Sequence, residues 1–211
     1  MTEYLTEQEQ VEQLKRLFWL YGIPALLGLL IGIVIFYGWN YYQSYRARLL
    51  SHASRIYDEM LINRAQNNPH ETQVQAKKLF THYPSTPYSE VAALMLAHEA
   101  VNKKNYSEAT KQLLWVRQYS RSDSIRQIAG LRLARLFLAQ QNPDAAINAL
   151  KKIEDKTYSG LIDEVRGDAY LAKKQLAEAR EAYQQALQEL PHSEEMRPLL
   201  VMKLNNLATA G

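Results

Sequence analysis

The chain of 211 residues contains no cysteine. This absence excludes a disulfide framework, thiol catalysis and cysteine-based metal sites. Glycine and proline are also scarce, at eight and seven residues, and half of the glycines lie in or beside one apolar stretch near the N-terminus. No segment alternates β-branched and polar residues between glycine turns, which is the pattern typical of strands. The sequence therefore predicts an all-α protein.

Motifs for catalysis are lacking as well. The chain has no G-x-S-x-G elbow, Walker loop, G-x-G-x-x-G or H-E-x-x-H motif, and its five histidines show no metal-ligand spacing. A net charge of +3 without a basic block does not favour nucleic-acid binding. We expect no catalytic, cofactor-binding or metal-binding residues. An enzyme with an unrecognised site is the alternative of a different class.

No charged residue occurs between Arg16 and Arg46. The apolar centre of this interval, Leu17–Tyr37, is 21 residues long, and a helix of that length spans about 31 Å, close to the ~30 Å hydrocarbon core of a bilayer. Trp and Tyr residues gather at both of its ends, as they do at headgroup depth. The sequence predicts a transmembrane helix at residues 17–42, kinked at Pro24. Residues 1–16 are expected to form a short amphipathic segment that starts with the capping box Thr6–Glu9.

Two features of this helix concern its partners and its orientation. Gly28 and Gly32 form a G-x-x-x-G motif, which lets two helices approach closely in lipid, and the alternative is that glycine is simply common in membrane helices. The flanking charges do not decide the orientation, because Lys15 and Arg16 precede the helix and Arg46 and Arg48 follow it. A reversed topology, with the following domain in the cytoplasm, stays open on this evidence.

The rest of the chain repeats itself. Helix-breaking points at Lys104-Asn105, Gln141-Asn142-Pro143 and Lys174-Gln175 are each followed by an alanine-containing helical pattern. The alanines at 76, 109, 146 and 179 are spaced 33, 37 and 33 residues apart, near the 34-residue period of tetratricopeptide repeats. We expect a membrane-proximal helix with a degenerate first repeat at 43–89. Tetratricopeptide-like helix pairs should occupy 90–211 as an α-solenoid, ending in a capping helix at Met196–Leu207.

Close helix crossings in such repeats need small residues, here Ala97 with Ala109, Ala134 with Ala146, and Gly167 with Ala179. The extra residues of the 37-residue spacing are expected in a polar loop at Tyr119–Ser124.

Solenoids of this kind present the first helix of each pair to a concave groove. The repeat positions place twelve residues there, mostly apolar with isolated charges of both signs. We predict that this surface binds an apolar or extended polypeptide and not an acidic chain terminus. Arg126, Arg132 and Arg135 form a basic stretch that is either a solvated face or a partner contact. The predicted groove residues are Val91, Leu94, His98, Val101, Ile128, Leu131, Arg135, Leu138, Leu161, Glu164, Asp168 and Leu171.

Several short segments in one order resemble the YfgM-type ancillary subunits of the bacterial SecYEG translocon over nearly the full length. They are Val11-Glu12 with Lys15-Arg16 and Phe18, Gly38-Trp39, Leu131-Arg132-Leu133-Ala134-Arg135, Val165-Arg166-Gly167-Asp168, and Met202-Lys203-Leu204-Asn205-Asn206-Leu207.

The resemblance implies a single-pass protein of the bacterial inner membrane, with a cytoplasmic N-terminus and a periplasmic repeat domain. It also implies association with SecYEG and with the membrane-anchored chaperone PpiD, no cofactor and no catalytic residues. This protein and PpiD together would assist client polypeptides as these emerge from the translocon. The competing interpretation is a structural subunit that mainly self-associates through Gly28, Gly32 and its repeats.

Overall fold

The computed structural model describes residues 11–12, 15–153, 156–190 and 196–209. The capping box predicted at Thr6–Glu9 lies outside these residues. The chain divides into two compact units, Met1–His52 and Ala53–Gly211. The boundary falls inside helix α2 (Ile23–Ala65), whose last turns belong to the second unit. We refer to the second unit as the repeat domain.

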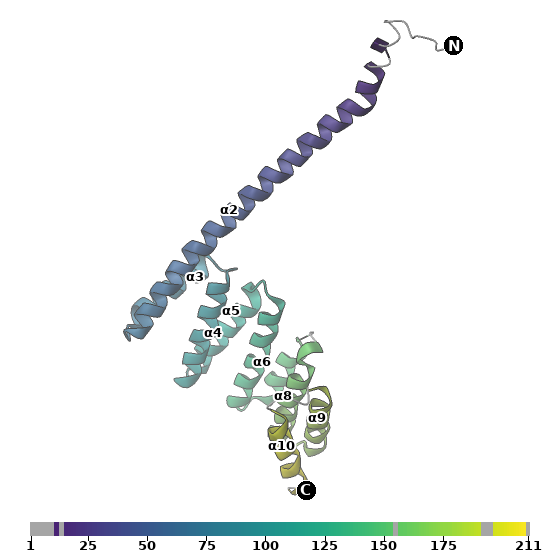
Figure 1. Cartoon of the computed structure of the whole chain (residues 1–211). Coiled ribbons are helices and arrows are strands. Elements are labelled where there is room, and N and C mark those ends of the chain that lie inside the picture. The colour runs from purple at the N-terminus through teal and green to yellow at the C-terminus, as the bar shows by residue number, and fades with distance from the viewer. Residues whose placement is uncertain (1–10, 13–14, 154–155, 191–195, 210–211) are drawn as a thin grey trace, which may run out of the picture. The chain divides into compact units, whose positions relative to one another are not determined.

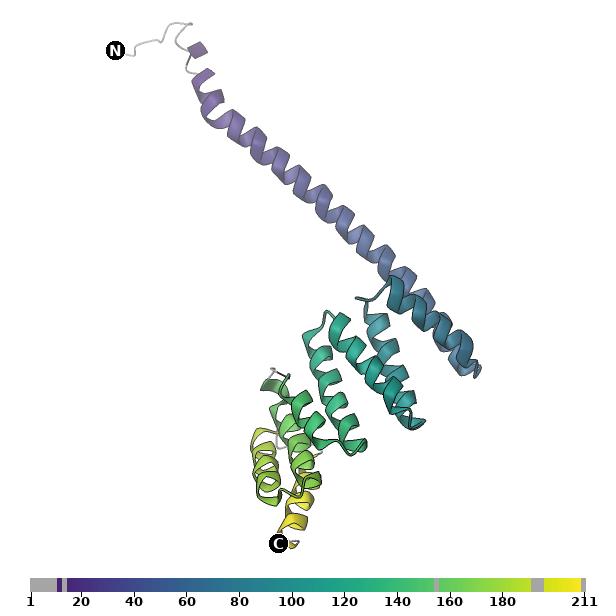
Figure 2. The ribbon, with the colours of Figure 1, turned by 180° about the vertical axis from the view of Figure 1, so that it is seen from behind.

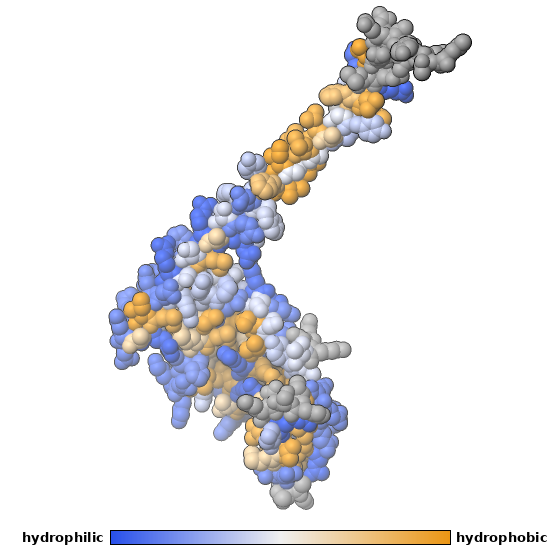
Figure 3. All heavy atoms as spheres, in the orientation of Figure 1, coloured by the Kyte–Doolittle hydropathy of each residue, from blue (hydrophilic) through white to orange (hydrophobic). Residues whose placement is uncertain are grey.

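The first unit contains the long apolar segment. A π-helical turn, η1 (Phe18–Gly22), leads into α2 immediately before Pro24. Proline cannot donate a backbone hydrogen bond and crowds the preceding turn, and a π-turn is one way to accommodate that disruption. Among the described residues, one helical stretch, Lys15–Ala65, is long and apolar enough to cross a membrane, and the protein buries none of its most apolar part. Figure 3 shows this part of α2 as an apolar surface.

The repeat domain consists of consecutive antiparallel helices, with no strand among the residues that the structure describes, which confirms the all-α prediction. The first helices of successive pairs lie side by side, α4 against α6 and α6 against α8 (Figures 1 and 2). The last turns of α2 and helix α3 form the first pair. The helices after α2 are α3 (Pro69–His82), α4 (Pro87–Asn102), α5 (Tyr106–Tyr119), α6 (Asp123–Ala139), α7 (Pro143–Leu150), the 3-10 turn η2 (Lys156–Tyr158), α8 (Ser159–Ala172), α9 (Leu176–Glu189) and α10 (Arg197–Thr209).

One repeated turn joins the two helices of each pair. A residue with φ between 56° and 61° follows the first helix, a conformation uncommon for side chains other than glycine. The next residue is the N-cap of the second helix, Asn68, Asn105, Asn142 or Gln175. Each asparagine accepts a hydrogen bond from the backbone N–H three residues later, at 3.1–3.4 Å. These turns confirm the predicted helix breaks. The residues with positive φ are Asn67, Lys104, Gln141 and Lys174.

Gln175 is the exception among the four caps, and we expect Gln175→Asn to stabilise the repeat domain. Its side chain makes no capping bond, and its Oε1 is buried without a hydrogen-bond partner. Its φ of −89° and ψ of 78° match the −85° and 73° of Asn105, so the shorter amide fits the same geometry. A restored cap should raise the free energy of unfolding by about 1 kcal/mol.

Urea unfolding of the full chain in detergent micelles, followed by circular dichroism, measures this change. Gln185→Asn, on the exposed face of the same helix, is the control and should give no gain. Equal midpoints for the two variants would refute the capping argument.

Apolar cores lie between successive pairs and make each pair dependent on its neighbour. One core joins the end of α2 to α3 and α4 around Met60 and Leu79. The next joins α4, α5 and α6, a third joins α6, α7 and α8, and the last joins α9 to α10. Leu200 and Leu207 of α10 are buried in that last core, so α10 is the predicted capping helix.

Two details of the predicted repeat need correction. The backbone N–H groups of Ala109, Ala146 and Ala179 each donate to the carbonyl of the N-cap residue of their helix. In the first pair the equivalent residue is Thr72, one turn before the predicted Ala76. The residues of the longer spacing do not form a loop at Tyr119–Ser124, because α5 runs to Tyr119 and α6 begins at Asp123. The extra length lies mainly in α6, which has 17 residues against 14 in α8.

At Gly167, the ring of Tyr183 lies against the position that a Cβ would occupy. The close crossing that the sequence pattern assigned to Gly167 and Ala179 therefore also involves this ring.

Candidate protein-binding groove

A groove of about 710 Å³ runs between α4 and α6 of the repeat domain. In Figure 3, apolar side chains gather on the face of the repeat domain over these two helices. The lining contains histidine and arginine but no carboxylate. We call this feature the α4/α6 groove. Its lining residues are Val91, Leu94, Met95, Ala97, His98, Val101, Leu113, Arg132, Arg135, Leu136 and Ala139.

The α4 wall follows from helical spacing. Val91, Leu94, His98 and Val101 recur every three or four residues, so they share one face of α4. The buried alanines Ala92, Ala93 and Ala100 of the same helix lie outside the groove lining and pack into the cores. Val91 and Val101 remain 47% and 37% exposed although they are apolar. Contiguous exposed apolar surface on a soluble domain is typical of a site that contacts a partner.

The α6 wall carries two arginines in different states. Arg135 donates a hydrogen bond to Glu164 of α8 at 2.9 Å, so its charge is matched within the domain. Arg132 is exposed, and among the described residues it has no ion-pair partner. Arg126, the third member of the predicted basic stretch, pairs with Asp123 and donates to the carbonyl of Ser120. The basic stretch thus contributes one unmatched charge, at Arg132.

The structure brings five of the twelve predicted groove residues into this groove: Val91, Leu94, His98, Val101 and Arg135. It places the apolar residues that were predicted on α6 elsewhere. Leu131 is 5% exposed and lies in the core with α7 and α8, Leu138 packs against that core, and Ile128 is half-buried outside the lining. Six lining residues were not among the predicted ones: Met95, Ala97, Leu113, Arg132, Leu136 and Ala139. On α6 the lining face is therefore offset by one residue from the predicted face.

In the last repeat, the predicted groove residues meet the C-terminal helix. Leu161 packs in the cores on both sides of α8, and Leu171 is exposed. The side chains of Glu164 and Asp168 bind Lys203 of α10. The Lys203 Nζ lies 2.7 Å from Glu164 Oε1 and 2.7 and 2.9 Å from the two oxygens of Asp168. The Tyr183 hydroxyl donates a hydrogen bond to Asp168 Oδ1 at 2.6 Å. These two carboxylates fix the capping helix.

Electrostatics keeps this network charged at neutral pH. Burial raises the pKa of Glu164, but hydrogen bonds from Lys203 and Arg135 outweigh that effect and hold it below its usual value. Burial lowers the pKa of Lys203, but the carboxylates of Asp168 and Glu164 outweigh that effect and raise it overall. Burial, followed by the bond to Asp168, raises the pKa of Tyr183. We call Lys203, Glu164, Asp168 and Tyr183 the clasp. The pKa values of Glu164, Lys203 and Tyr183 all lie further from neutral pH than usual, so these three groups keep one protonation state across the physiological range.

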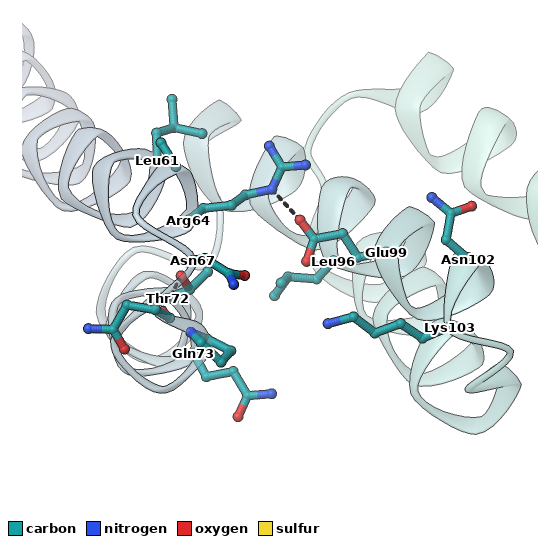
Figure 4. Close-up of a pocket in the computed structure, with 12 residues that line it drawn as sticks. Leu61, Arg64, Asn67, Thr72, Gln73, Leu96, Glu99, Asn102 and Lys103 are labelled. Carbon is teal, nitrogen blue, oxygen red and sulfur yellow. Dashed lines mark hydrogen bonds and ion pairs between the residues drawn. The ribbon is translucent and has the colours of Figure 1, made fainter.

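Another hollow, of about 500 Å³, lies between the end of α2, the start of α3 and the end of α4 (Figure 4). Arg64 and Glu99 form an ion pair across it, drawn as a dashed line. The surrounding side chains are mainly polar, including Asn67, Gln73 and Lys103. Its lining carries more charged and amide side chains than the lining of the α4/α6 groove.

Two further predictions concern metal ligands and helix packing. Among the described residues, no group of three or more His, Asp and Glu side chains is placed to hold a metal ion. At Gly28 and Gly32, an added Cβ would meet no atom within 4 Å. Both glycines leave open surface on α2, as the predicted helix–helix contact requires.

Comparison with known proteins covers nearly the whole chain. Residues 15–209 match the model of the tetratricopeptide repeat-like domain family. The chain is 31% identical to the ancillary SecYEG translocon subunit of Neisseria gonorrhoeae over 98% of its own length and all of that protein. It is 28% identical to the Escherichia coli protein of the same name over 99% of this chain and all of that protein. For Haemophilus influenzae the identity is 26% over 98% of this chain and the entire relative. The chain therefore belongs to the tetratricopeptide repeat-like family of ancillary SecYEG translocon subunits.

Proposed function

We propose that this protein is a non-enzymatic, membrane-tethered interaction module of the Sec translocon, in which the α4/α6 groove holds segments of client polypeptides. The observation that carries this proposal is the groove itself, with exposed apolar walls on a domain of this family. The candidate membrane helix would confine the groove near the channel. Confinement raises the effective concentration of a weak binding site without any new contact.

The proposal also covers the cellular location of the protein and its partner proteins. The protein is a single-pass component of the bacterial inner membrane, with its N-terminus in the cytoplasm and its repeat domain in the periplasm. It acts beside a PpiD-like membrane-anchored chaperone on secreted and periplasmic proteins. Support comes from the names of the relatives and from the one described helix able to cross a membrane.

Site-specific photo-crosslinking in native membranes tests the proposal. A secretory precursor is arrested in the channel, and a probe is placed at Leu94 in the groove or at Gly32 on the apolar part of α2. We expect the Leu94 probe to capture the arrested precursor and the Gly32 probe to capture a translocon subunit. Leu114, an apolar residue on α5 that is 47% exposed and outside the groove lining, is the matched control.

Three outcomes would count against the proposal. Equal capture of the precursor from Leu94 and Leu114 would remove the role of the groove. Capture of only other copies of this chain from Gly32 would favour the self-associating scaffold, for which the open surface at Gly28 and Gly32 is the specific observation. Cleavage at the turn Asn67–Pro69 by protease added outside spheroplasts supports the periplasmic placement, and protection there would contradict it.

A further inference from the structure

The α4/α6 groove has an electrostatic asymmetry that its apolar character does not explain. Its lining includes Arg132, Arg135 and His98 and contains no acidic residue. Glu164 neutralises Arg135. His98 shares a hydrogen bond with Asn102 at 3.2 Å. Arg132 is the cation of this lining for which the described residues supply no counter-charge.

The position of Arg132 distinguishes it from an ordinary surface arginine. It lies on the same wall as Leu136 and Ala139, and the apolar wall of α4 faces it across the groove. A segment occupying the groove would displace water from that apolar surface and lower the effective dielectric around the guanidinium. An ion pair formed there is stronger than one formed in open solvent. Because a guanidinium has a planar set of donors, it matches a carboxylate in a bidentate arrangement.

From this charge complementarity we infer that the groove selects extended polypeptide segments in which an aspartate or glutamate lies next to large apolar residues. The carboxylate pairs with Arg132, and the apolar side chains rest on Val91, Leu94 and Val101. An internal acidic side chain is the partner group and not a chain terminus, since the lining lacks the Asn and Lys side chains of a carboxylate clamp. This inference rests on the proposed function, in which the groove binds polypeptide.

Peptide binding to the full chain in detergent micelles tests the inference. Fluorescence anisotropy compares short leucine-rich peptides, blocked at both ends, that differ only in a central Glu, Gln or Lys. We expect the Glu peptide to bind about fivefold more tightly than the Gln peptide, with the preference weakening as salt is added. The Arg132→Gln variant should bind both with equal affinity, and Arg132→Glu should prefer the Lys peptide. Arg132 is exposed, so these variants should keep the fold, which circular dichroism verifies.

Two controls separate this inference from the proposed function. Lys111→Gln removes one positive charge outside the groove lining, from a side chain that is 76% exposed, and should keep the preference for Glu. Leu94→Asp should weaken binding of the Glu and Gln peptides alike. If wild type binds Glu and Gln peptides equally, or if Lys111→Gln abolishes the preference, the selectivity inference is overturned while the groove stands. If wild type binds none of the peptides, the groove proposal itself fails and the inference fails with it.

Discussion

Replacing Lys203 by methionine is expected to lower the free energy of unfolding at neutral pH by about 3 kcal/mol, because it removes the cation that Glu164 and Asp168 share and leaves Glu164 with Arg135 alone. The Glu164 side chain is 5% exposed and that of Lys203 is 20% exposed. Methionine keeps most of the aliphatic volume of lysine, so the loss of stability comes from the missing charge and not from a cavity. Denaturant unfolding of the full chain in micelles measures it.

Lys173→Met is the matched control for this substitution. Lys173 also pairs with a carboxylate, Asp144, at 2.6 Å, but that carboxylate is 72% exposed. An exposed pair contributes only about 0.5 kcal/mol. A loss in Lys203→Met no larger than that in Lys173→Met would mean that the clasp does not stabilise the capping helix.

The difference in the free energy of unfolding between wild type and Lys203→Met should depend on pH in a defined direction. The pKa of Glu164 is lowered in the folded state, so its contribution is present above its unfolded value and is lost as the pH falls through the folded value. The pKa of Lys203 is raised, so its contribution is complete throughout the range below its unfolded value. The difference should therefore narrow on acidification below about pH 4.5, the reference value for Glu164.

Asp163 titrates in the opposite direction, because burial raises its pKa and Arg166 offsets this only in part. Its ionised form costs stability in the folded domain, and acidification removes that cost. Asp163 is common to wild type and Lys203→Met, so the difference between them isolates the clasp.

Gly167→Ala is expected to lower the free energy of unfolding by about 2 kcal/mol through overlap with a packed ring. An added Cβ at Gly167 would overlap the ring of Tyr183, whose side chain is fully buried and bonded to Asp168. Helix propensity alone would favour alanine over glycine by about 1 kcal/mol. A loss of stability, which thermal or urea unfolding measures, can therefore come only from this contact.

A double variant tests the assignment to Tyr183. The earlier repeats carry Ala97 with Leu113 and Ala134 with Leu150 at the equivalent positions. Where alanine replaces glycine, leucine thus replaces the larger tyrosine. Gly167→Ala combined with Tyr183→Leu should lose less stability than the sum of the two single changes, by about 1 kcal/mol or more. Simple additivity would show that the two sites do not contact as described.

Helix breaks and caps were predictable because their causes are local. The turns at Asn67, Lys104, Gln141 and Lys174 are each followed by an amide side chain at the N-cap. Capping depends on residues within three positions of each other, so the pattern is visible without a fold. The first repeat was misaligned by one turn at Ala76, because alanine there is buried for packing against α4 and Thr72 holds the repeat position.

The groove was only partly predictable for the opposite reason. The groove residues predicted on α4, which are Val91, Leu94, His98 and Val101, all line the α4/α6 groove. Both α4 and α6 contact helices of the preceding and the following pair, so both are apolar on more than one side. Periodicity then does not indicate which apolar face is the open one. Leu131 went into the core and Arg132 into the groove.

The sequence by itself determined the apolar helix, the helix pairs, their turns and the capping helix, because each depends on hydrophobic length, periodicity or capping within a few residues. Tertiary structure alone decided which face of α6 lines the groove. It also brought Lys203 to Glu164 and Asp168, which lie 39 and 35 residues away in the chain. Contacts of that separation depend on how the helices stack, and stacking is set by shape and buried area summed over many residues.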